Sequence, residues 1–379
     1  MLPAEIEMTE ATRTWLVFAQ EHPICTALVD KLRESGCKVF VIGDSSRRDY
    51  KIQVDFRIDP LDQNDYSRVF AEVADRALDG ISILHMWNLV SDFDSFTDAE
   101  KLEHVTTYGV LSLSRLLRSF LETDSGAQLD ISVVSDRVFE VDDADWAISE
   151  KSLLIGPCRV IPQENPGVRC RLIDVGNRSR NQLSLLSARI WDELFTADPV
   201  PVVALRGTHR WSPHYPALHL PQAGTSPLLR ENGVYLIWGG TGEIGLEIAR
   251  SLHENAKARI AIVARHSLPL LSEADQVLDS EIEKTLTPQL RALNQLKHEG
   301  GEILTLRGDI VSEESVRRVT RDVLDKFGVI HGVFHLAGAT GQSVVHLAAD
   351  ADKEQVNAIT EAKVYGIRNI ERAMGDCDL

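Results

Sequence analysis

The chain has 379 residues, a length that suits two domains better than one. Its formal net charge of -17 argues against nucleic acid and against an anionic membrane as the main partner. The five cysteines form no CxxC pair and have no histidine pair at ligand spacing nearby, so the sequence predicts neither a disulfide framework nor a metal site.

The amino-terminal composition and the lack of long apolar runs indicate the cellular compartment. Residues 1–7 carry acidic side chains where a secretory signal needs basic ones. No apolar run is long enough to span a bilayer, and scattered cysteines suit a reducing environment. We therefore expect a cytoplasmic protein.

The first half of the chain alternates strand-like and helix-like patterns. A short apolar run, a segment with apolar residues at helical spacing and a second apolar run predict a βαβ unit. The predicted strands cover residues 15–19, 38–42, 81–84 and 131–134, and the predicted helices cover residues 24–32, 66–78 and 102–121. This alternation predicts a parallel sheet covered by helices.

The stretch between the two halves is rich in proline, histidine and aromatic side chains. Residues 202–205 and 217–220 are expected to pair there as strands. Residues 221–227 then have the composition of a linker. We therefore expect two domains, 1–220 and 221–379.

The second half repeats the plan of the first. Its predicted strands cover residues 233–237, 259–263, 302–306 and 332–336, and its predicted helices cover residues 246–253, 288–299, 313–327 and 353–374. The sequence therefore predicts an α/β fold with two tandem, Rossmann-like, doubly wound parallel sheets, of which the second is incomplete.

A glycine-rich loop follows the first predicted strand of the second half and opens the next predicted helix. It consists of Gly239, Gly240, Thr241, Gly242, Glu243, Ile244 and Gly245. Glycine allows a tight turn, lets the backbone approach a pyrophosphate and lets the helix pack close to the strand. Because the start of a helix also supplies N–H groups and a positive dipole end, the loop is predicted to bind a dinucleotide.

The end of the following strand, at Ala264 and Arg265, indicates which dinucleotide binds. NAD-binding proteins place an acidic residue there, whereas a guanidinium can bind two oxygens of the 2′-phosphate of NADP. Arg265 therefore predicts NADPH as the cofactor. In the first half the corresponding turn, 20–23, lacks glycine and contains Glu21, so we expect that half to bind no nucleotide.

With these features, the chain resembles the ketoreductase domains of modular type I polyketide synthases, which are members of the short-chain dehydrogenase/reductase superfamily. The resemblance covers nearly the whole chain, and its motifs lie at residues 156–164, 207–211, 308–310, 335–339 and 362–369. It implies a structural subdomain, 1–220, that has lost cofactor binding, followed by a catalytic subdomain, 221–379.

The resemblance also implies roles for single residues. Asp309 and Ile310 match the segment that meets the adenine ring, and Ala337 and Gly338 match the loop beneath the nicotinamide. Lys363 matches the catalytic lysine of the family, whose positive charge lowers the pKa of a catalytic tyrosine.

Three departures from the family pattern bear on activity. Trp238 stands where relatives have threonine, and its bulky indole is expected to repack the cofactor loop. Residues 340–343 replace the Leu-Asp-Asp signature of one stereochemical class, so the handedness of the product stays open. The catalytic serine and tyrosine of the family are expected beyond Leu379, so this chain alone is expected to be inactive.

The resemblance implies NADPH-dependent reduction of a β-ketoacyl thioester on an acyl carrier protein to the β-hydroxyacyl form, as a step in polyketide biosynthesis. The implied partners are that carrier protein and other polyketide synthase domains, with no nucleic acid, membrane or metal. Two alternatives stay open: a non-catalytic scaffold or docking module, and a short-chain reductase acting on free small molecules.

Overall fold

The computed structural model describes residues 14–47, 50–74, 80–123, 128–143, 145–176, 183–196, 199–219, 228–265, 288–338 and 346–375. The chain divides into two compact units by the contacts of its backbone. Unit 1 consists of Met1–Pro216 with Val345–Lys353, and unit 2 consists of Ala217–Val344 with Glu354–Leu379. Unit 1 is therefore made from two separate pieces of the sequence.

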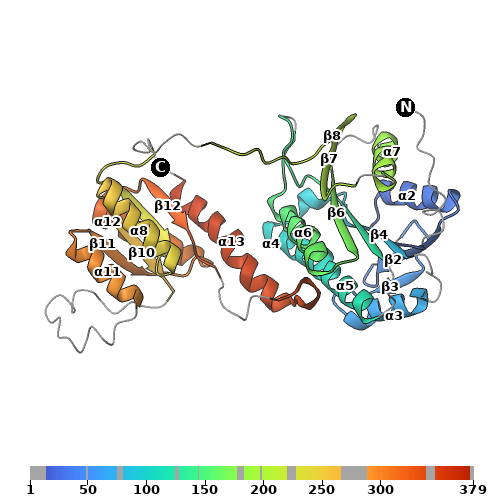
Figure 1. Ribbon diagram of the computed structural model, residues 1–379, viewed down its shortest axis with the longest axis horizontal. Helices are drawn as coiled ribbons and strands as arrows, with labels where there is room; N and C mark the ends of the chain where they lie inside the picture. Colours follow the sequence, from blue (N-terminus) through green and yellow to red (C-terminus); the bar gives the residue numbers. More distant parts are fainter. Residues whose placement is uncertain are drawn as a thin grey trace. The chain divides into compact units, whose positions relative to one another are not determined.

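Unit 1 is built on an eight-stranded sheet with the order β3-β2-β1-β4-β5-β6-β7-β8 (Figure 1). Its strands are β1 (Thr14–Phe18), β2 (Lys38–Asp44), β3 (Phe56–Ile58), β4 (Ile81–Asn88), β5 (Leu129–Asp136), β6 (Val168–Val175), β7 (Val202–Arg206) and β8 (His209–Trp211). Neighbouring strands from β3 to β7 are parallel, and β8 is antiparallel to β7. The strand order reverses between β1 and β4, which is where sheets of this kind bind ligands.

Helices cover both faces of this sheet. One core, with Val17, Leu28 and Trp191 among its buried residues, lies under α2 and α7. The other, with Phe70 and Leu117, lies under α3 and α5. The helical elements of unit 1 are α2 (Pro23–Glu34), α3 (Gln63–Ala74), the 3-10 helix η1 (Phe93–Ser95), α4 (Asp98–Val105), the π-helix η2 (Thr106–Leu111), α5 (Ser112–Glu122), the 3-10 helix η3 (Ser149–Leu154), α6 (Ile155–Glu164) and α7 (Leu183–Leu194).

Unit 2 contains a four-stranded parallel sheet among its described residues, with the order β11-β10-β9-β12. Its strands are β9 (Val234–Trp238), β10 (Arg259–Ala264), β11 (Ile303–Arg307) and β12 (Gly332–His335). Its helices are α8 (Glu243–Ala256), α11 (Pro288–His298), α12 (Glu313–Phe327) and α13 (Lys353–Met374). Helices α8 and α11 cover one face, and α12 and α13 cover the other.

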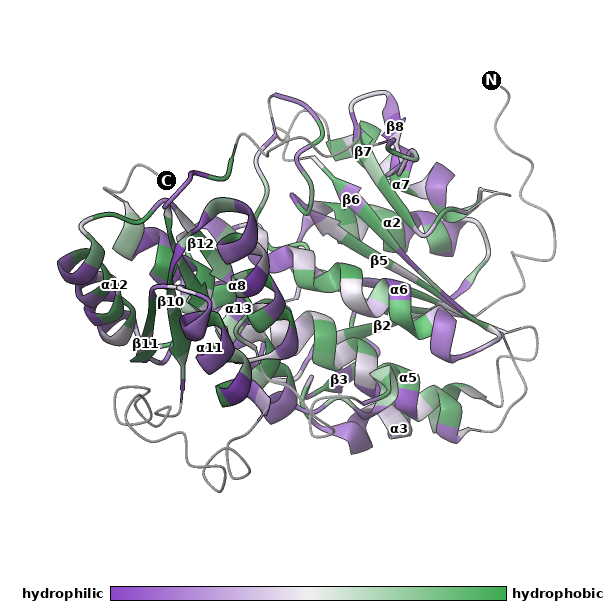
Figure 2. Ribbon diagram, turned by 60° about the vertical axis from the view of Figure 1, so that its left-hand side comes forward, coloured by the Kyte–Doolittle hydropathy of each residue, from purple (hydrophilic) through white to green (hydrophobic). Residues whose placement is uncertain are grey.

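Hydropathy explains this arrangement of unit 2. Figure 2 shows the strands of the sheet in hydrophobic colours, whereas α12 carries many hydrophilic residues. The buried residues of α12 are Val316, Val319, Thr320, Val323 and Phe327, a helical spacing that forms one apolar stripe. The prediction of an α/β fold with two doubly wound parallel sheets is confirmed.

The predicted pairing of residues 202–205 with residues 217–220 is wrong. β7 pairs instead with β8, with Arg206 opposite His209, and the described part of 217–220 contains no strand. The reason is the two-residue turn between them, in which Gly207 has a φ of 54°. A glycine with positive φ at the first turn position closes a tight hairpin with the residues that follow at once.

Residues 346–353 are held on unit 1 by hydrogen bonds and apolar contacts. The backbone N–H of Ala348, in the 3-10 helix η6 (Ala348–Asp350), donates to Oε2 of Glu164 at 2.7 Å. Nζ of Lys353 lies 2.5 Å from Oε1 of Glu103. Ala348 and Ala349 also pack against the core beneath α5. This segment docks on unit 1 immediately before α13 continues into unit 2.

Two findings concern membrane-spanning helices and the state of the cysteines. Across the part of the chain that the structure describes, no helix combines the length and the apolar character needed to cross a membrane. The described cysteines, Cys25, Cys37, Cys158 and Cys170, are buried free thiols.

His85 makes the stability of unit 1 depend on pH. It is fully buried, its Nε2 lies 2.9 Å from Oγ of Ser112, and its ring stacks on Phe18. Burial lowers the pKa of His85 from 6.5 to about 3. The folded state thus keeps this imidazole neutral, whereas the unfolded chain binds a proton below about pH 6.5.

We therefore expect unit 1 to lose stability as the pH falls from about 6.5 towards 3, because only the unfolded state gains the proton at His85. The His85→Phe variant keeps a ring at this position but cannot titrate. Urea unfolding between pH 7 and 5 should show a shallower decline for this variant, by up to about 1.4 kcal/mol per pH unit. The exposed His214→Phe variant is the control. An equal decline in His85→Phe and the parent chain would contradict the prediction.

Candidate functional site

The glycine-rich loop joins β9 to α8 through positions that have no room for a side chain. Gly239 has a φ of 77°, and a Cβ on it would lie 2.7 Å from the backbone nitrogen of Ala337. A Cβ on Gly240 would lie 2.9 Å from Cγ2 of Ile262, and a Cβ on Gly245 would lie 2.6 Å from the Cα of Gly240. The loop, the helix and the adjacent strand therefore approach one another closely.

Gly242 differs from these three because it faces open space. It is the N-cap residue of α8, and a Cβ on it would meet only the carbonyl oxygen of Gly239, at an ordinary 3.6 Å. Next to it Thr241 is half-buried, while Glu243 and Ile244 are exposed. The first N–H groups of a helix have no partner within the helix, so this opening suits an anionic group.

Two arginines gather at the carboxyl ends of β10 and β11. Ala264 pairs in register with Arg307, and Arg265 follows Ala264 on the surface. Nε of Arg307 donates a hydrogen bond to the carbonyl oxygen of Arg265 at 3.3 Å, and both residues are exposed. The sequence pattern pointed to Arg265 but not to Arg307. Arg307 could have been found as the last residue of β11, the strand parallel to and next to β10.

The loop after β11 is tied to α13. Asp309 is exposed and its Oδ1 accepts a hydrogen bond from the N–H of Val311 at 3.0 Å, whereas Ile310 is 3% exposed and packs in the core. Nδ2 of Asn369 donates to the carbonyl oxygens of Ile310 and Val311 at 3.0 and 2.9 Å. Asn369 was missed because its partners lie far away in the sequence.

Lys363 lies beside the turn that follows β12. A Cβ on Gly338 would lie 3.3 Å from Cε of Lys363 and 3.5 Å from its Nζ, so the lysine side chain passes over that glycine. Ala337, one residue earlier, is the residue that approaches Gly239. The structure thus brings the glycine-rich loop, this turn and Lys363 together. Residues 340–343 lie outside the described residues.

Trp238, whose indole was expected to repack the cofactor loop, packs in the core of unit 2 instead. Its side chain is 1% exposed and belongs to the core beneath α12, together with Val263 and Val316. A Cβ on Gly308 would lie 3.0 Å from Cζ3 of the indole, so a glycine in the next segment makes room for the ring. Because the indole packs under the sheet, it leaves the opening at Gly242 free.

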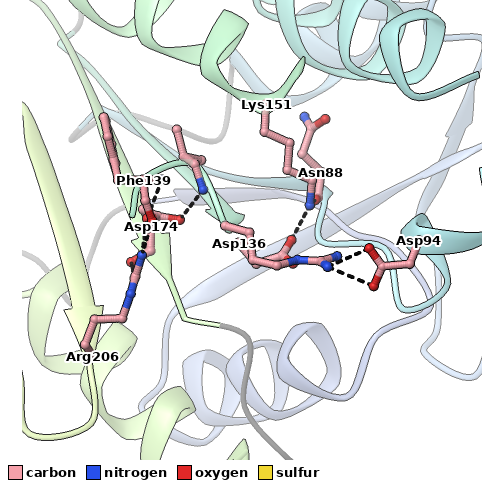
Figure 3. Close-up of polar contacts among 9 residues, drawn as sticks. Asn88, Asp94, Asp136, Phe139, Lys151, Asp174 and Arg206 are labelled. Atoms are coloured by element: carbon pink, nitrogen blue, oxygen red, sulfur yellow. Dashed lines mark hydrogen bonds and ion pairs between the residues drawn. The ribbon is translucent and has the colours of Figure 1, made fainter. Parts of the chain in front are cut away.

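Unit 1 fills the carboxyl ends of its own strands with paired charges (Figure 3). Nη2 of Arg206 donates to Oδ2 of Asp174 at 2.7 Å, and their side chains are 1% and 0% exposed. At the ends of β4 and β5, Nζ of the fully buried Lys151 donates to the carbonyl oxygen of Asn88 at 3.1 Å and pairs with Asp136. These side chains lie at the carboxyl ends of the strands of unit 1, and the glycine-rich loop of unit 2 lies at the corresponding end of its own sheet.

The end of β2 in unit 1 is also occupied by the chain itself. Asp44 stands where an NAD-binding sheet has its acidic residue, and it is 1% exposed. Its Oδ2 accepts a hydrogen bond from the hydroxyl of Tyr108 at 2.6 Å, and its Oδ1 accepts one from the N–H of Ser46 at 2.7 Å. The Tyr108 hydroxyl thus takes the bond that a ribose hydroxyl would need.

No group of three or more histidine, cysteine, aspartate or glutamate side chains is placed to hold a metal ion within the described ranges. His331 and His335 lie at opposite ends of β12 and bond to different partners. Nδ1 of His331 accepts from the N–H of Val234 at 2.9 Å, while Nε2 of His335 lies 2.9 Å from the carbonyl oxygen of Ala362.

Comparisons with known proteins bear on this arrangement. Residues 233–379 match the family model described as KR domain, and residues 13–193 match the one described as Beta-ketoacyl synthase-like, N-terminal. Residues 233–379 are thus similar to a ketoreductase domain, and the curated relatives are polyketide synthases. The resemblance identified from the motifs is confirmed. The matched region includes the glycine-rich loop, the turn at Gly338 and Lys363.

The curated relatives are much longer than this chain. It is 31% identical over 242 residues to the 6-methylsalicylic acid synthase of Aspergillus terreus, which covers 62% of this chain and 13% of that protein. It is 24% identical over 270 residues to a phenolphthiocerol/phthiocerol polyketide synthase protein of Mycobacterium tuberculosis, covering 71% and 14%. The chain therefore spans about one seventh of the length of these two relatives.

Solved ketoreductase structures share the fold of nearly the whole chain. An adenylation, ketoreductase and pseudo Asub multidomain structure of a keto acid-selecting NRPS module matches with a TM-score of 0.76 at 21% identity, covering 95% of this chain and 29% of that one. The first ketoreductase of the tylosin PKS matches with a TM-score of 0.67 at 18% identity, covering 97% and 68%. At these identities the likeness shows the fold alone, a Rossmann-like α/β fold.

The buried pairing of Arg206 gives a test of unit 1. Besides Asp174, the Arg206 guanidinium pairs with Asp145 and donates to the carbonyl oxygen of Phe139 at 2.9 Å. The Arg206→Ala variant should lower the free energy of unfolding of unit 1 by about 3–5 kcal/mol, since it leaves Asp174 buried without its counter-charge. Urea unfolding measures this loss.

The matched control is Arg118→Ala, which removes an exposed arginine paired with Glu122 at 3.1 Å on α5. This exposed pair should contribute less than about 1 kcal/mol. A loss of the same small size for Arg206→Ala would mean that the network in Figure 3 does not stabilise unit 1.

Proposed function

We propose that unit 2 binds NADPH as part of a reductase that converts a β-ketoacyl thioester, carried by an acyl carrier protein, to the β-hydroxyacyl form. The observation that carries the proposal is the meeting of the glycine-rich loop, the turn at Gly338 and Lys363. The KR match and the polyketide synthase relatives support the substrate class and, as partners, the carrier protein and further synthase domains.

The loop fits a dinucleotide in shape and charge. The open side of Gly242 leaves room for a pyrophosphate at the first turn of α8, whose N–H groups and positive dipole end favour an anion. Ile244, 69% exposed, adds an apolar surface next to it. Arg265 and Arg307 supply two positive charges at the strand ends, which favours the 2′-phosphate of NADPH over the free ribose of NADH.

NADPH, when bound, supplies the hydride. The main chain of residues 239–245 holds its phosphates and fixes its orientation. Lys363 keeps a positive charge beside Gly338, close to the turn that the family places under the nicotinamide. Such a charge lowers the pKa of a neighbouring tyrosine hydroxyl, which is the role that the family resemblance gives this lysine.

In this proposal unit 1 has a structural role and binds no nucleotide. The turn after β1, residues 20–23, has no glycine, and the Glu21 carboxylate would repel a phosphate. Asp44 is already bonded to Tyr108, and Arg206 and Lys151 occupy strand ends. The alternative function, a non-catalytic scaffold, was suggested by a tryptophan at position 238. Because the indole of Trp238 is buried, it leaves the cofactor loop free.

Gly242→Ala tests the site without disturbing the fold. The φ of Gly242, -73°, suits alanine, and the new Cβ would make only an ordinary contact at 3.6 Å. The methyl group would nevertheless take up space at the first turn of α8. We expect NADPH affinity, measured by fluorescence titration of the whole chain, to fall at least about tenfold, or 1.4 kcal/mol, with a nearly unchanged melting temperature.

Gly156→Ala is the control, because a Cβ there meets nothing within 4 Å and the residue lies on α6 of unit 1. It should leave NADPH affinity unchanged. Tight NADPH binding that persists in Gly242→Ala would place the dinucleotide elsewhere, and unit 1 would then need to be reconsidered.

Arg265→Ala tests the choice of cofactor. Hydrogen bonds to charged groups contribute about 1.5–3 kcal/mol each, and less at an exposed site such as this one. We therefore expect Arg265→Ala to weaken NADPH binding about tenfold while NADH binding stays the same. Arg321→Ala, which removes an exposed arginine on α12, is the control. Equal losses for both cofactors, or none, would remove Arg265 from the phosphate site.

A further inference from the structure

A side-chain hydrogen bond joins the end of β12 to helix α13. His335 is the last residue of β12, and its Nε2 lies 2.9 Å from the carbonyl oxygen of Ala362 in α13. A Cβ on Gly366 would lie 3.2 Å from the same Nε2, so the glycine one turn further along allows the imidazole to reach the helix. In the sequence, His335 has no signal beyond its place in the motif at residues 335–339.

The chemistry of this contact determines which imidazole nitrogen of His335 carries the hydrogen. A carbonyl oxygen only accepts, so Nε2 of His335 must carry the hydrogen. Nδ1 is buried and has no hydrogen-bond partner in the described part of the chain. Burial lowers the pKa of His335, the Ala362 carbonyl opposes that shift, and the Lys363 charge adds to it. The imidazole is therefore neutral and donates from Nε2.

The same two segments meet a second time at the candidate site. Lys363 follows Ala362 in the helix, and Gly338, over which the lysine side chain lies, comes three residues after His335. Seven residues, or two turns, beyond Ala362, Asn369 fixes the same side of α13 to the loop after β11. Two side-chain bonds on one face thus set the rotation of α13 about its axis.

We propose that His335 is a positioning residue, which holds α13 at Ala362 and thereby keeps the Lys363 ammonium over Gly338. This inference rests on the proposed role of Lys363 towards the cofactor. Without the Nε2 bond, α13 could shift against β12 by a fraction of a turn. The lysine charge would then leave the turn at Gly338.

A double-mutant cycle tests this role. NADPH affinity is measured by titration of the whole chain for the parent, His335→Leu, Lys363→Ala and the double variant. We expect His335→Leu to weaken binding about three- to tenfold in the parent and to have no further effect once Lys363 is alanine. His335→Gln, whose amide can donate from a similar place, should recover most of the affinity.

The control is His331→Leu, because His331 precedes the same strand at its other end and bonds to Val234. Any effect of that variant on NADPH affinity should be the same with and without Lys363. Melting temperatures of all variants report folding separately.

The outcomes separate the two proposals. If His335→Leu weakens binding by the same factor in both backgrounds, or if His335→Gln binds as poorly as His335→Leu, His335 has only a structural role and the inference is wrong. If Lys363→Ala alone leaves NADPH affinity unchanged, the role assigned to Lys363 fails and this inference fails with it, whereas NADPH binding at the glycine-rich loop is tested separately by Gly242→Ala.

Discussion

Where α8 begins, the chain packs so closely that Gly239, Gly240 and Gly245 have no room for a Cβ atom. Main-chain atoms exclude it at Gly239 and Gly245, and the side chain of Ile262 excludes it at Gly240. This close packing leaves the N–H groups of the first helical turn at the open side of the loop, beside Gly242. The rest of the candidate site lies around this loop. Ala337, which follows the end of β12, packs against Gly239. The site is thus formed largely by main chain, and its geometry depends on how tightly the strands and α8 pack.

The two units use the carboxyl ends of similar sheets in opposite ways. In unit 2 this edge is open and lined by glycine and arginine, which suits an anionic ligand. In unit 1 the same edge is filled by Arg206, Lys151 and their carboxylate partners, and Tyr108 completes the bonds of Asp44. Burying charged side chains at the edge of a sheet costs desolvation free energy. Their ion pairs and hydrogen bonds offset this cost. The shared fold therefore says little about function, and the side chains at the strand ends decide it.

The sequence predicts those parts of the fold and site whose signal lies within a short stretch of chain. The loop 239–245 and most apolar strands are of this kind, because one window contains both the glycines or apolar run and its flanks. β6 was missed because Arg169 and Arg171 alternate with its apolar residues, and β3 because it has only three residues. The sequence likewise gives little sign of residues whose partners lie far away in the chain, namely Arg307, His335 and Asn369.

The docking of residues 346–353 on unit 1 has a consequence for how the chain folds as it is synthesised. Protein domains generally fold as they leave the ribosome, the amino-terminal one first. Unit 1 cannot reach its final form in that order, because its last segment emerges only after most of unit 2 has been made. Until then the surface around Glu164 and Glu103, which receives Ala348 and Lys353, stays uncovered. A single cut between Pro216 and Ala217 would likewise leave unit 1 without that segment, which would stay attached to the piece that contains unit 2.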